Sequence, residues 1–160
     1  MAMQRTLILA KPDAVQRGLV GQLLTRFERK GLKIVGLKLM QMTDATAARH
    51  YAAHAQKPFY AGLVRFMTSS PIVAIALEGI GAVDVCRKMM GTTFGSKAEP
   101  GTMRGDFGVS NSFNLIHGSD SPEAAAKELA LFFTAGELLD YELDAFRWIY
   151  DEVEELGGTA

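Results

Sequence analysis

The chain has 160 residues, of which 48% are hydrophobic and 22% are charged, and its formal net charge is −1 at pH 7. This length and balance suit a single folded domain over residues 1–160 and exclude a disordered chain. The lack of a basic surplus argues against a protein that binds specific nucleic acid, whereas a small anion needs only a local cluster of cations.

Membrane and secretory signals are not expected in this sequence. The longest purely apolar run, Ile72 to Leu77, is far too short to span a membrane. The first residues have neither a long apolar run nor a small-residue cleavage site, so no secretory signal is predicted. Cys86 is the only cysteine, which favours a reducing, cytoplasmic location.

The first patterns along the chain predict a strand and then a helix. Residues 5–10 predict a buried strand. An amphipathic helix follows, because four apolar residues recur at the spacing of one helical face: Val20, Leu23, Leu24 and Phe27. Gly31 follows two basic residues and is expected to cap the C-terminus of this helix.

A second strand and two helical segments complete the first half. The strand is predicted over residues 32–42, with three apolar residues on one face: Val35, Leu37 and Leu39. A helix is expected to start at Thr43 or Asp44 and to run to about residue 54. A further helical segment is expected over residues 58–67.

The second half continues the alternation. Residues 71–79 predict a third strand, and residues 81–90 predict a helix. Residues 91–112 are Gly-rich, polar and without periodicity, which predicts a long functional or disordered loop. Residues 113–117 predict a fourth strand. Ser121-Pro122-Glu123 is a strong start for a helix that runs to about residue 133.

This order of strands and helices predicts an α/β (α+β) fold. A ferredoxin-like sandwich, with helices packed on a four-stranded antiparallel sheet, fits two split βαβ halves. A doubly wound parallel sheet is the alternative.

Common phosphate and metal motifs are absent. No P-loop occurs, and "EGIGAVD" fails as a dinucleotide fingerprint because Asp84 stands where a third glycine is required. His50 and His54 share a helical spacing, but no acid accompanies them as in a zinc-binding HExxH motif, so no structural zinc site is expected.

His117 is the strongest candidate for chemistry. It lies at the end of a predicted strand, and Gly118 is expected to let the backbone turn and leave the ring accessible. The following segment leads into a helix N-terminus, where an anion can be held. Glu128 lies two helical turns further on, where its carboxylate would bond one ring nitrogen and leave the other free as a nucleophile. A hydrogen-bonded core histidine and an exposed helix glutamate are the structural alternatives.

The segment "NLIHGSD" resembles the active-site signature of nucleoside diphosphate kinases. The segments "RTLILAKPDAVQRGLVG", "GLK", "HY", "KPFYAGLV", "PGTMRGDF" and "ELLDYE" resemble the same family in the same order. The resemblance covers about residues 4–151. It implies transfer of a γ-phosphoryl group from a nucleoside triphosphate to a nucleoside diphosphate, by a ping-pong mechanism through phospho-His117. An imidazole suits this role, because its neutral form is available at pH 7 without a separate base.

The resemblance also implies roles for individual residues. The phosphates would be bound by three cations, two hydroxyl groups and, at the α-phosphate, one histidine: Lys11, Arg87, Arg104, Tyr51, Thr93 and His54. The base would stack on Phe59 and contact Leu63, the sugar would contact Asn114 and Lys11, and Asn111 would lie near the base edge. Ser119 and Glu128 would hold the ring of His117. Mg²⁺ is expected to be held mainly by the nucleotide, with no protein side chain as a ligand.

Members of the family form oligomers, which implies a homo-oligomer, with a hexamer favoured over a tetramer. The sequence departs from the family at Ala14, at Phe94-Gly95 and at Ala135-Gly136, where glycine or proline is usual; these positions put loop rigidity in doubt. Two alternatives remain: a non-catalytic nucleotide-binding or regulatory scaffold, and a phosphotransferase that acts on a protein histidine.

Overall fold

Four strands form one antiparallel sheet in the computed structural model, which describes residues 3–151. The strands are β1 (Met3–Ala10), β2 (Lys33–Met40), β3 (Ile72–Ile80) and β4 (Ile116–Gly118). Their order across the sheet is β2-β3-β1-β4, and all three neighbouring pairs are antiparallel. The ferredoxin-like prediction is therefore confirmed, and the parallel alternative is wrong.

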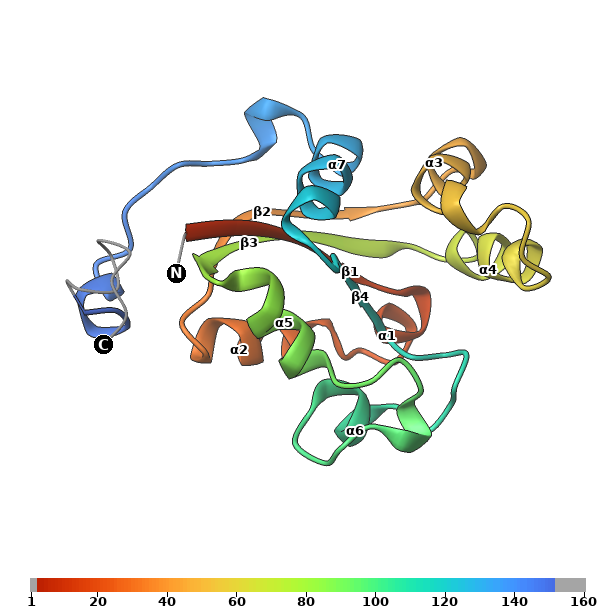
Figure 1. Ribbon diagram of the computed structural model, residues 1–160, viewed down its shortest axis with the longest axis horizontal. Helices are drawn as coiled ribbons and strands as arrows, with labels where there is room; N and C mark the ends of the chain where they lie inside the picture. Colours follow the sequence, from red (N-terminus) through yellow and green to blue (C-terminus); the bar gives the residue numbers. More distant parts are fainter. Residues whose placement is uncertain (1–2, 152–160) are drawn as a thin grey trace.

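Helices cover both faces of the sheet (Figure 1). One face carries α1 (Pro12–Gln16), α2 (Val20–Arg29), α5 (Ala82–Met90) and α6 (Met103–Phe107). The other carries α3 (Asp44–His50), α4 (Tyr60–Met67) and α7 (Pro122–Phe132). Four short 3₁₀ turns complete the described chain: η1 (Ala52–His54), η2 (Gly95–Lys97), η3 (Ala135–Glu137) and η4 (Phe146–Trp148).

The two central strands, β1 and β3, separate two apolar cores. They pair over the whole of β1, from Met3 opposite Ile80 to Ala10 opposite Val73. Successive side chains of β1 point alternately into the two cores, so Ile8 packs with α2 and α5 whereas Leu9 packs with α3 and α7. Because helices cover both faces, β3 and the second half of β1 are apolar at nearly every position.

Strand β2 differs from its prediction. A β-bulge between Ile34 and Gly36 shifts the register, so Val35 is buried in the core under α3 and α7. Leu37 and Leu39 then pair with residues of β3 whose side chains belong to the opposite core, and they are 50% and 67% exposed. The prediction that these three residues share one face is therefore wrong.

Helix boundaries also differ from the expected ones. The helix predicted to reach residue 54 ends at His50, and a 3₁₀ turn follows. The short helix α1 was not predicted, because its five residues are too few to show periodicity. The caps of the longer helices are as expected: Gly31 has a φ of 95°, and the Ser121 hydroxyl accepts a hydrogen bond from the amide of Ala124.

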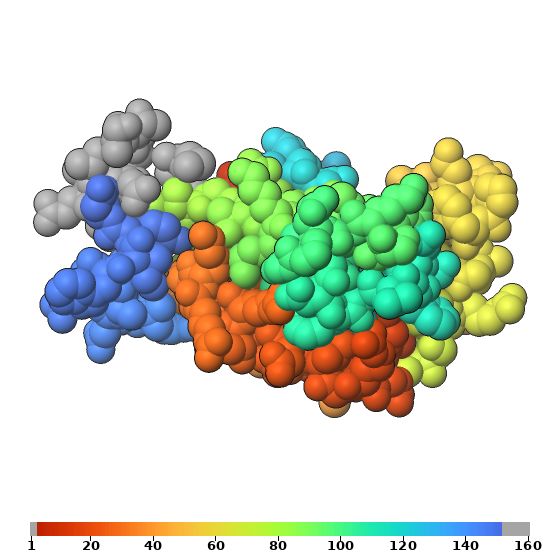
Figure 2. All heavy atoms as spheres, turned by 90° about the horizontal axis from the view of Figure 1, so that it is seen from below, coloured from red at the N-terminus to blue at the C-terminus, as the bar shows by residue number. Residues whose placement is uncertain are grey.

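The long segment 91–112 is ordered and contains both η2 and α6. Figure 2 shows this segment packed against the N-terminal part of the chain. Arg17 donates to the carbonyl of Phe107 (2.7 Å), and Arg26 donates to the carbonyl of Gly101 (3.2 Å). Helix α6 is capped by the Thr102 hydroxyl, which accepts from the amide of Gly105. The segment is therefore not disordered, and the alternative of a functional loop stays a prediction.

The residues that depart from the pattern of the resembled family fit their surroundings in the structure. Ala14 is buried within α1 and does not have the positive φ that would strain an alanine. A side chain at Gly95 would approach the carbonyl oxygen of Gly108 to 2.4 Å, so the glycine permits close packing of the loop. The turn at Ala135-Gly136 is held by Glu137, which accepts from the amide of Thr134 (2.7 Å).

Two further sequence interpretations concern the C-terminal tail and membrane-spanning helices. The polar tail after Tyr150 lies outside the described residues, apart from Asp151. Within residues 3–151, the helices are all too short or too polar to cross a membrane.

Candidate active site

His117 lies on the edge strand β4, directly opposite Leu9 of β1. Paired residues point to the same face of a sheet, and Leu9 belongs to the core under α3 and α7. The imidazole therefore lies between these two helices, and its side chain is 25% exposed. The strand thus presents the ring to solvent at the rim of this core.

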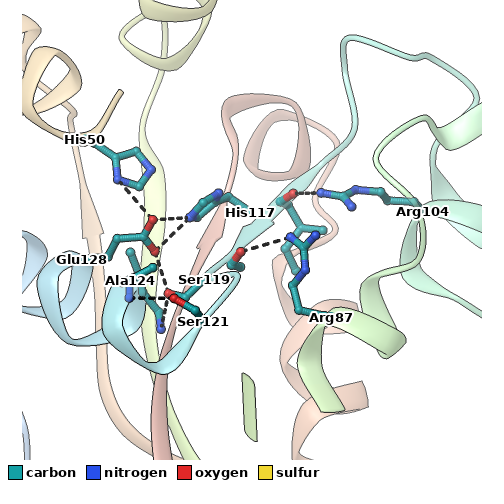
Figure 3. Close-up of polar contacts among 11 residues, drawn as sticks. His50, Arg87, Arg104, His117, Ser119, Ser121, Ala124 and Glu128 are labelled. Carbon is teal, nitrogen blue, oxygen red and sulfur yellow. Dashed lines mark hydrogen bonds and ion pairs between the residues drawn. The ribbon is translucent and has the colours of Figure 1, made fainter. Parts of the chain in front are cut away.

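Glu128 of α7 holds one nitrogen of this ring (Figure 3). His117 Nε2 lies 3.1 Å and 3.2 Å from the two carboxylate oxygens, and the Ser119 hydroxyl donates to Oε2 at 2.6 Å. An ionised carboxylate only accepts, so Nε2 carries a proton, and in the neutral form of the ring the lone pair is on Nδ1. No protein partner for Nδ1 occurs among residues 3–151.

The carboxylate of Glu128 is stabilised in its charged form. Burial raises the pKa of Glu128, but the hydrogen bond and charge of His117, together with the hydroxyl of Ser119, outweigh burial and hold the pKa below its ordinary value. Ser119 is itself fixed, because its hydroxyl also accepts from the amide of Leu7 (3.3 Å). The ring orientation is thus set by β1, β4 and α7 together.

Gly118 serves packing and not the turn that the sequence suggested. Its φ is not positive. An added Cβ would lie 2.6 Å from Met90 Sδ and 3.1 Å from Ile8 Cδ1. The glycine therefore lets α5 pack closely under β4 while the neighbouring histidine points to the other face.

A strained turn precedes β4. Leu115 is the one non-glycine residue between 3 and 151 with a positive φ, 70°. The Ile116 amide donates to the carbonyl of Asn114 (2.8 Å) across this tight turn, and the Leu115 amide donates to Asp13 Oδ2 (3.1 Å). Such a conformation costs on the order of 1–3 kcal/mol and persists only where neighbours enforce it. Because of this turn, β4 begins only at Ile116 and runs to Gly118, so it is shorter than the strand predicted over 113–117.

Lys11 follows β1 and points toward the same turn. Its Nζ donates to Asn114 Oδ1 at 2.7 Å, and Asn114 Nδ2 donates to the carbonyl of Thr93 at 2.8 Å. Lys11 is 9% exposed. Burial, followed by the nearby charge of Arg104, lowers its pKa to about 8.

Two arginines approach β4 from the other side of His117 (Figure 3). Arg104 is buried and donates to the carbonyls of Asn114 (3.1 Å), Gly91 (2.9 Å) and Ile116 (2.5 Å). Burial, followed by the charge of Arg87, lowers the pKa of Arg104 to about 10. Arg87 is exposed and makes one long contact with the carbonyl of Gly118 (3.4 Å).

The other predicted binding residues surround this centre less tightly. Tyr51 is buried, and its hydroxyl has no hydrogen-bond partner within the described chain. Phe59 is 55% exposed, and its ring lies 5.5 Å from that of exposed His54. Leu63 is half-buried and Thr93 is exposed. These residues make no direct contact with His117 among those that the structure records.

Asn111, which the resemblance placed near the base edge, accepts a hydrogen bond from the Ser96 hydroxyl (2.6 Å). Sequence reasoning gave no site role to two other residues. Asp13 supports the strained turn, and Phe113 stacks on Phe66 of α4 with ring centroids 4.9 Å apart. Only tertiary contacts reveal these roles, since none lies in a distinctive local pattern.

The sequence suggested no role for His50, which was considered only together with His54; His50 ends α3, whereas His54 lies in η1. The His50 side chain is 1% exposed and its ring centroid lies 4.8 Å from that of His117. Burial, followed by the charge of His117, lowers its pKa to about 4, so the ring is neutral at pH 7. Its nitrogens have no hydrogen-bond partner in the described part of the chain.

The fold and this geometry define the class: an α/β protein with an oriented imidazole, one of whose nitrogens is free, beside a cluster of cations. The family model for nucleoside diphosphate kinase matches residues 4–138. The nucleoside diphosphate kinases of Gloeobacter violaceus and Carboxydothermus hydrogenoformans are each 54% identical over 149 residues, which cover 93% of this chain and all of theirs.

Solved structures agree with the sequence comparison. A nucleoside diphosphate kinase from Halobacterium salinarum in complex with CDP has a TM-score of 0.92 and 48% identity, over 94% of this chain and all of that one. The enzyme from Aquifex aeolicus has a TM-score of 0.83 and 40% identity, over 86% of this chain and all of that one. The chain therefore belongs to the nucleoside diphosphate kinase family, and it is a nucleotide-binding kinase. The predicted family is confirmed.

Proposed function

We propose that the chain transfers the γ-phosphoryl group of a nucleoside triphosphate to a nucleoside diphosphate by way of phospho-His117. The observation that carries this proposal is the hold of Glu128 on His117 Nε2, which leaves Nδ1 free in a ring that reaches solvent. The name of the relatives states the diphosphate acceptor, and the Halobacterium structure contains CDP.

In the first half-reaction, the lone pair of Nδ1 attacks the γ-phosphorus. A P–N bond forms, and the bond to the leaving oxygen breaks as the nucleoside diphosphate departs with that electron pair. The ring becomes cationic, and Glu128 stabilises this charge through the hydrogen bond from Nε2–H. In the second half-reaction, an oxygen of another diphosphate attacks the phosphohistidine, and neutral His117 is restored.

The cations are proposed to bind the phosphates. Phosphoryl transfer spreads negative charge over the equatorial oxygens, so fixed positive charge lowers the barrier. Lys11 is held by Asn114 close to the strained turn, and Arg87 makes one long hydrogen bond, to the carbonyl of Gly118, within residues 3–151. Arg104 donates to the carbonyls of Asn114 and Ile116, and its buried guanidinium adds positive charge beside the proposed phosphate site. The hydroxyl groups of Tyr51 and Thr93 and the ring of His54 complete the proposed phosphate site.

The nucleoside is proposed to lie along the N-terminal end of α4. Phe59 exposes a ring face on which any base can stack, and Leu63 lies one turn further along the same helix. Stacking carries little base identity, which favours broad specificity. Asn114 and Lys11 are proposed to contact the sugar hydroxyls.

Mg²⁺ fits this site as an ion carried by the nucleotide. The side chains proposed to meet the phosphates are cations, hydroxyls and one imidazole, whereas Asp13 and Glu128 each bond groups of the protein. Mg²⁺ prefers phosphate oxygens and water in such sites, and when bound it offsets phosphate charge. The protein residues then orient the chain of phosphates toward Nδ1.

The single domain over residues 1–160, the cytoplasmic location and the homo-oligomer, with a hexamer favoured over a tetramer, belong to the same proposal. A regulatory scaffold and a protein-directed phosphotransferase remain its rivals. The exposed ring of Phe59, on which a base can stack, favours a free nucleotide over a protein acceptor.

A burst measurement tests the mechanism directly. With Mg-ATP and no added diphosphate, a ping-pong enzyme releases about one ADP per chain in a burst and keeps the phosphoryl group, whereas a sequential enzyme shows no burst. We expect the burst in the wild type and none in His117→Ala. Addition of GDP, CDP or UDP should then yield the matching triphosphate. Nucleotide binding without a burst would favour the scaffold, and labelling of an added protein but not of diphosphates would favour the other rival.

A further inference from the structure

His50, His117 and Glu128 come together from three separate elements. His50 ends α3, His117 lies on β4, and Glu128 lies on α7. One ligand atom from each residue can be chosen so that all three lie within 4.8 Å of one another. Figure 3 shows both rings directed at the same carboxylate. His50 Nδ1 lies 3.9 Å from Glu128 Oε1, which is too long for a hydrogen bond.

His50 is the unexplained member of this group. The mechanism proposed above uses His117 and Glu128 and leaves His50 without a role. A buried polar group ordinarily has a hydrogen-bond partner, yet the side chain of His50 is 1% exposed and both of its nitrogens lack one within the described chain. An imidazole nitrogen with a free lone pair is a common ligand for metal ions.

We propose that His50, His117 and Glu128 form a binding site for Zn²⁺, separate from the Mg²⁺ carried by the nucleotide, and that zinc bound there inhibits phosphorylation of His117. Two histidines and one glutamate, with water as a fourth ligand, are a common set for zinc at enzyme sites. Mg²⁺ prefers an octahedron of oxygen atoms and is a poor match for two imidazoles.

The geometry requires only small movements. Zinc bonds nitrogen and carboxylate oxygen at about 2.0–2.2 Å, so tetrahedral ligands lie about 3.4 Å apart. The separations from His117 Nε2 to Glu128 and from His50 Nδ1 to Glu128 are 3.1 Å and 3.9 Å. All three ligand atoms lie within 4.8 Å of one another, so side-chain shifts of up to about 1.4 Å, mainly in the His50 ring, bring the group to a zinc geometry.

Inhibition follows from the chemistry of the ring and rests on the proposed function. Zinc replaces the proton on Nε2, and its charge draws electrons from the imidazole that must attack through Nδ1. Zinc also takes the Glu128 carboxylate, which otherwise stabilises the cationic ring. Zinc bound at this site therefore disfavours formation of the phosphohistidine.

Zinc binding is measured first without nucleotide, by equilibrium dialysis of the full chain against Zn²⁺. Wild type and His54→Phe, which removes an exposed histidine, should each bind one ion at this site. His50→Phe and His50→Gln should bind it at least about tenfold more weakly. Equal binding in wild type and a folded His50 variant, checked by circular dichroism, would overturn the proposal.

Cobalt substitution gives a readout without any variant. Bound Co²⁺ should show the strong visible absorption of a tetrahedral or five-coordinate site. Weak absorption, typical of octahedral Co²⁺, would count against the zinc site.

The inhibitory role is measured by phosphoenzyme formation from Mg-ATP. Zinc should slow it in wild type, EDTA should restore it, and His50→Gln should need at least about tenfold more zinc for the same effect. Zinc binding with unchanged phosphorylation would refute inhibition. If no phosphoenzyme forms even without zinc, the proposed function fails while the dialysis and cobalt results still decide the zinc site.

Discussion

Lys11 makes the activity of this site dependent on pH in a specific direction. Its pKa is lowered to about 8 by burial and by Arg104, so its positive charge is lost as the pH rises through that value. The free enzyme should therefore lose kcat/KM above about pH 8, by up to tenfold per pH unit. Bound phosphates raise this pKa, so kcat should persist to higher pH. The measurement is a pH–rate profile.

Lys11→Arg is the matched control, because an arginine stays charged across this range. Its kcat/KM should be lower than that of the wild type but should not show the decline near pH 8. A wild-type kcat/KM that is flat from pH 7 to 10 would contradict the role of Lys11. Since the unfolded chain holds the Lys11 proton up to its ordinary pKa, the free energy of unfolding should rise between about pH 8 and 10.5.

Glu128 should matter through its charge. Glu128→Gln keeps the size of the side chain but replaces a charge-assisted hydrogen bond worth about 1.5–3 kcal/mol. We expect phosphorylation of His117 to slow by about 10- to 100-fold, measured by quench-flow with Mg-ATP. Glu123→Gln lies in the first turn of the same helix and is exposed, so it should leave the rate unchanged. Equal rates in both variants would refute the role of Glu128.

At the scale of elements, Arg104 joins α6 to the segments on either side of it. It donates to three backbone carbonyls, in Gly91, Asn114 and Ile116. Arg104→Met should leave buried carbonyls without donors and lower the free energy of unfolding by about 3 kcal/mol, or Tm by about 6–12 °C. Arg87→Met is the control. Arg87 is exposed and makes one long contact, so its loss should change stability by less than about 0.5 kcal/mol. A similar fall in Tm for both variants would contradict the structural role of Arg104.

The same elements show what local sequence patterns can predict. Apolar strands and the Ser121-Pro122 helix start have strong local signals, and the structure places them as predicted. The register of β2 could not be predicted, because a bulge moves Leu37 and Leu39 to the other face without a proline or glycine pair to mark it. Helix α6 was not predicted, because Arg104 holds it in place through carbonyls outside the helix, in Gly91 and Ile116, and no local pattern shows these contacts. His117 and Glu128 were paired from their spacing, whereas His50 joins them only through packing of α3 on the sheet.

At the scale of the whole molecule, the edge strand β2 offers a surface for assembly. Leu37 and Leu39 expose apolar side chains on this edge strand, and another chain can cover them. We expect the wild type to sediment at about six chain masses and Leu39→Lys to shift toward smaller species. Gln41→Lys is a control nearby that adds the same charge at a polar, exposed position. A wild-type monomer, or identical assembly of Leu39→Lys and wild type, would contradict an oligomer built on this edge.

The central claim is that His117 carries the phosphoryl group between nucleotides, and intact-mass measurement tests it most directly. Wild type and His117→Ala are exposed briefly to Mg-ATP, freed of nucleotide, weighed, and then chased with GDP. The account predicts one phosphoryl adduct in the wild type alone, with an acid-labile bond, and its discharge by GDP as GTP appears. An adduct that survives the His117→Ala substitution, or GTP formation without any adduct, would contradict it.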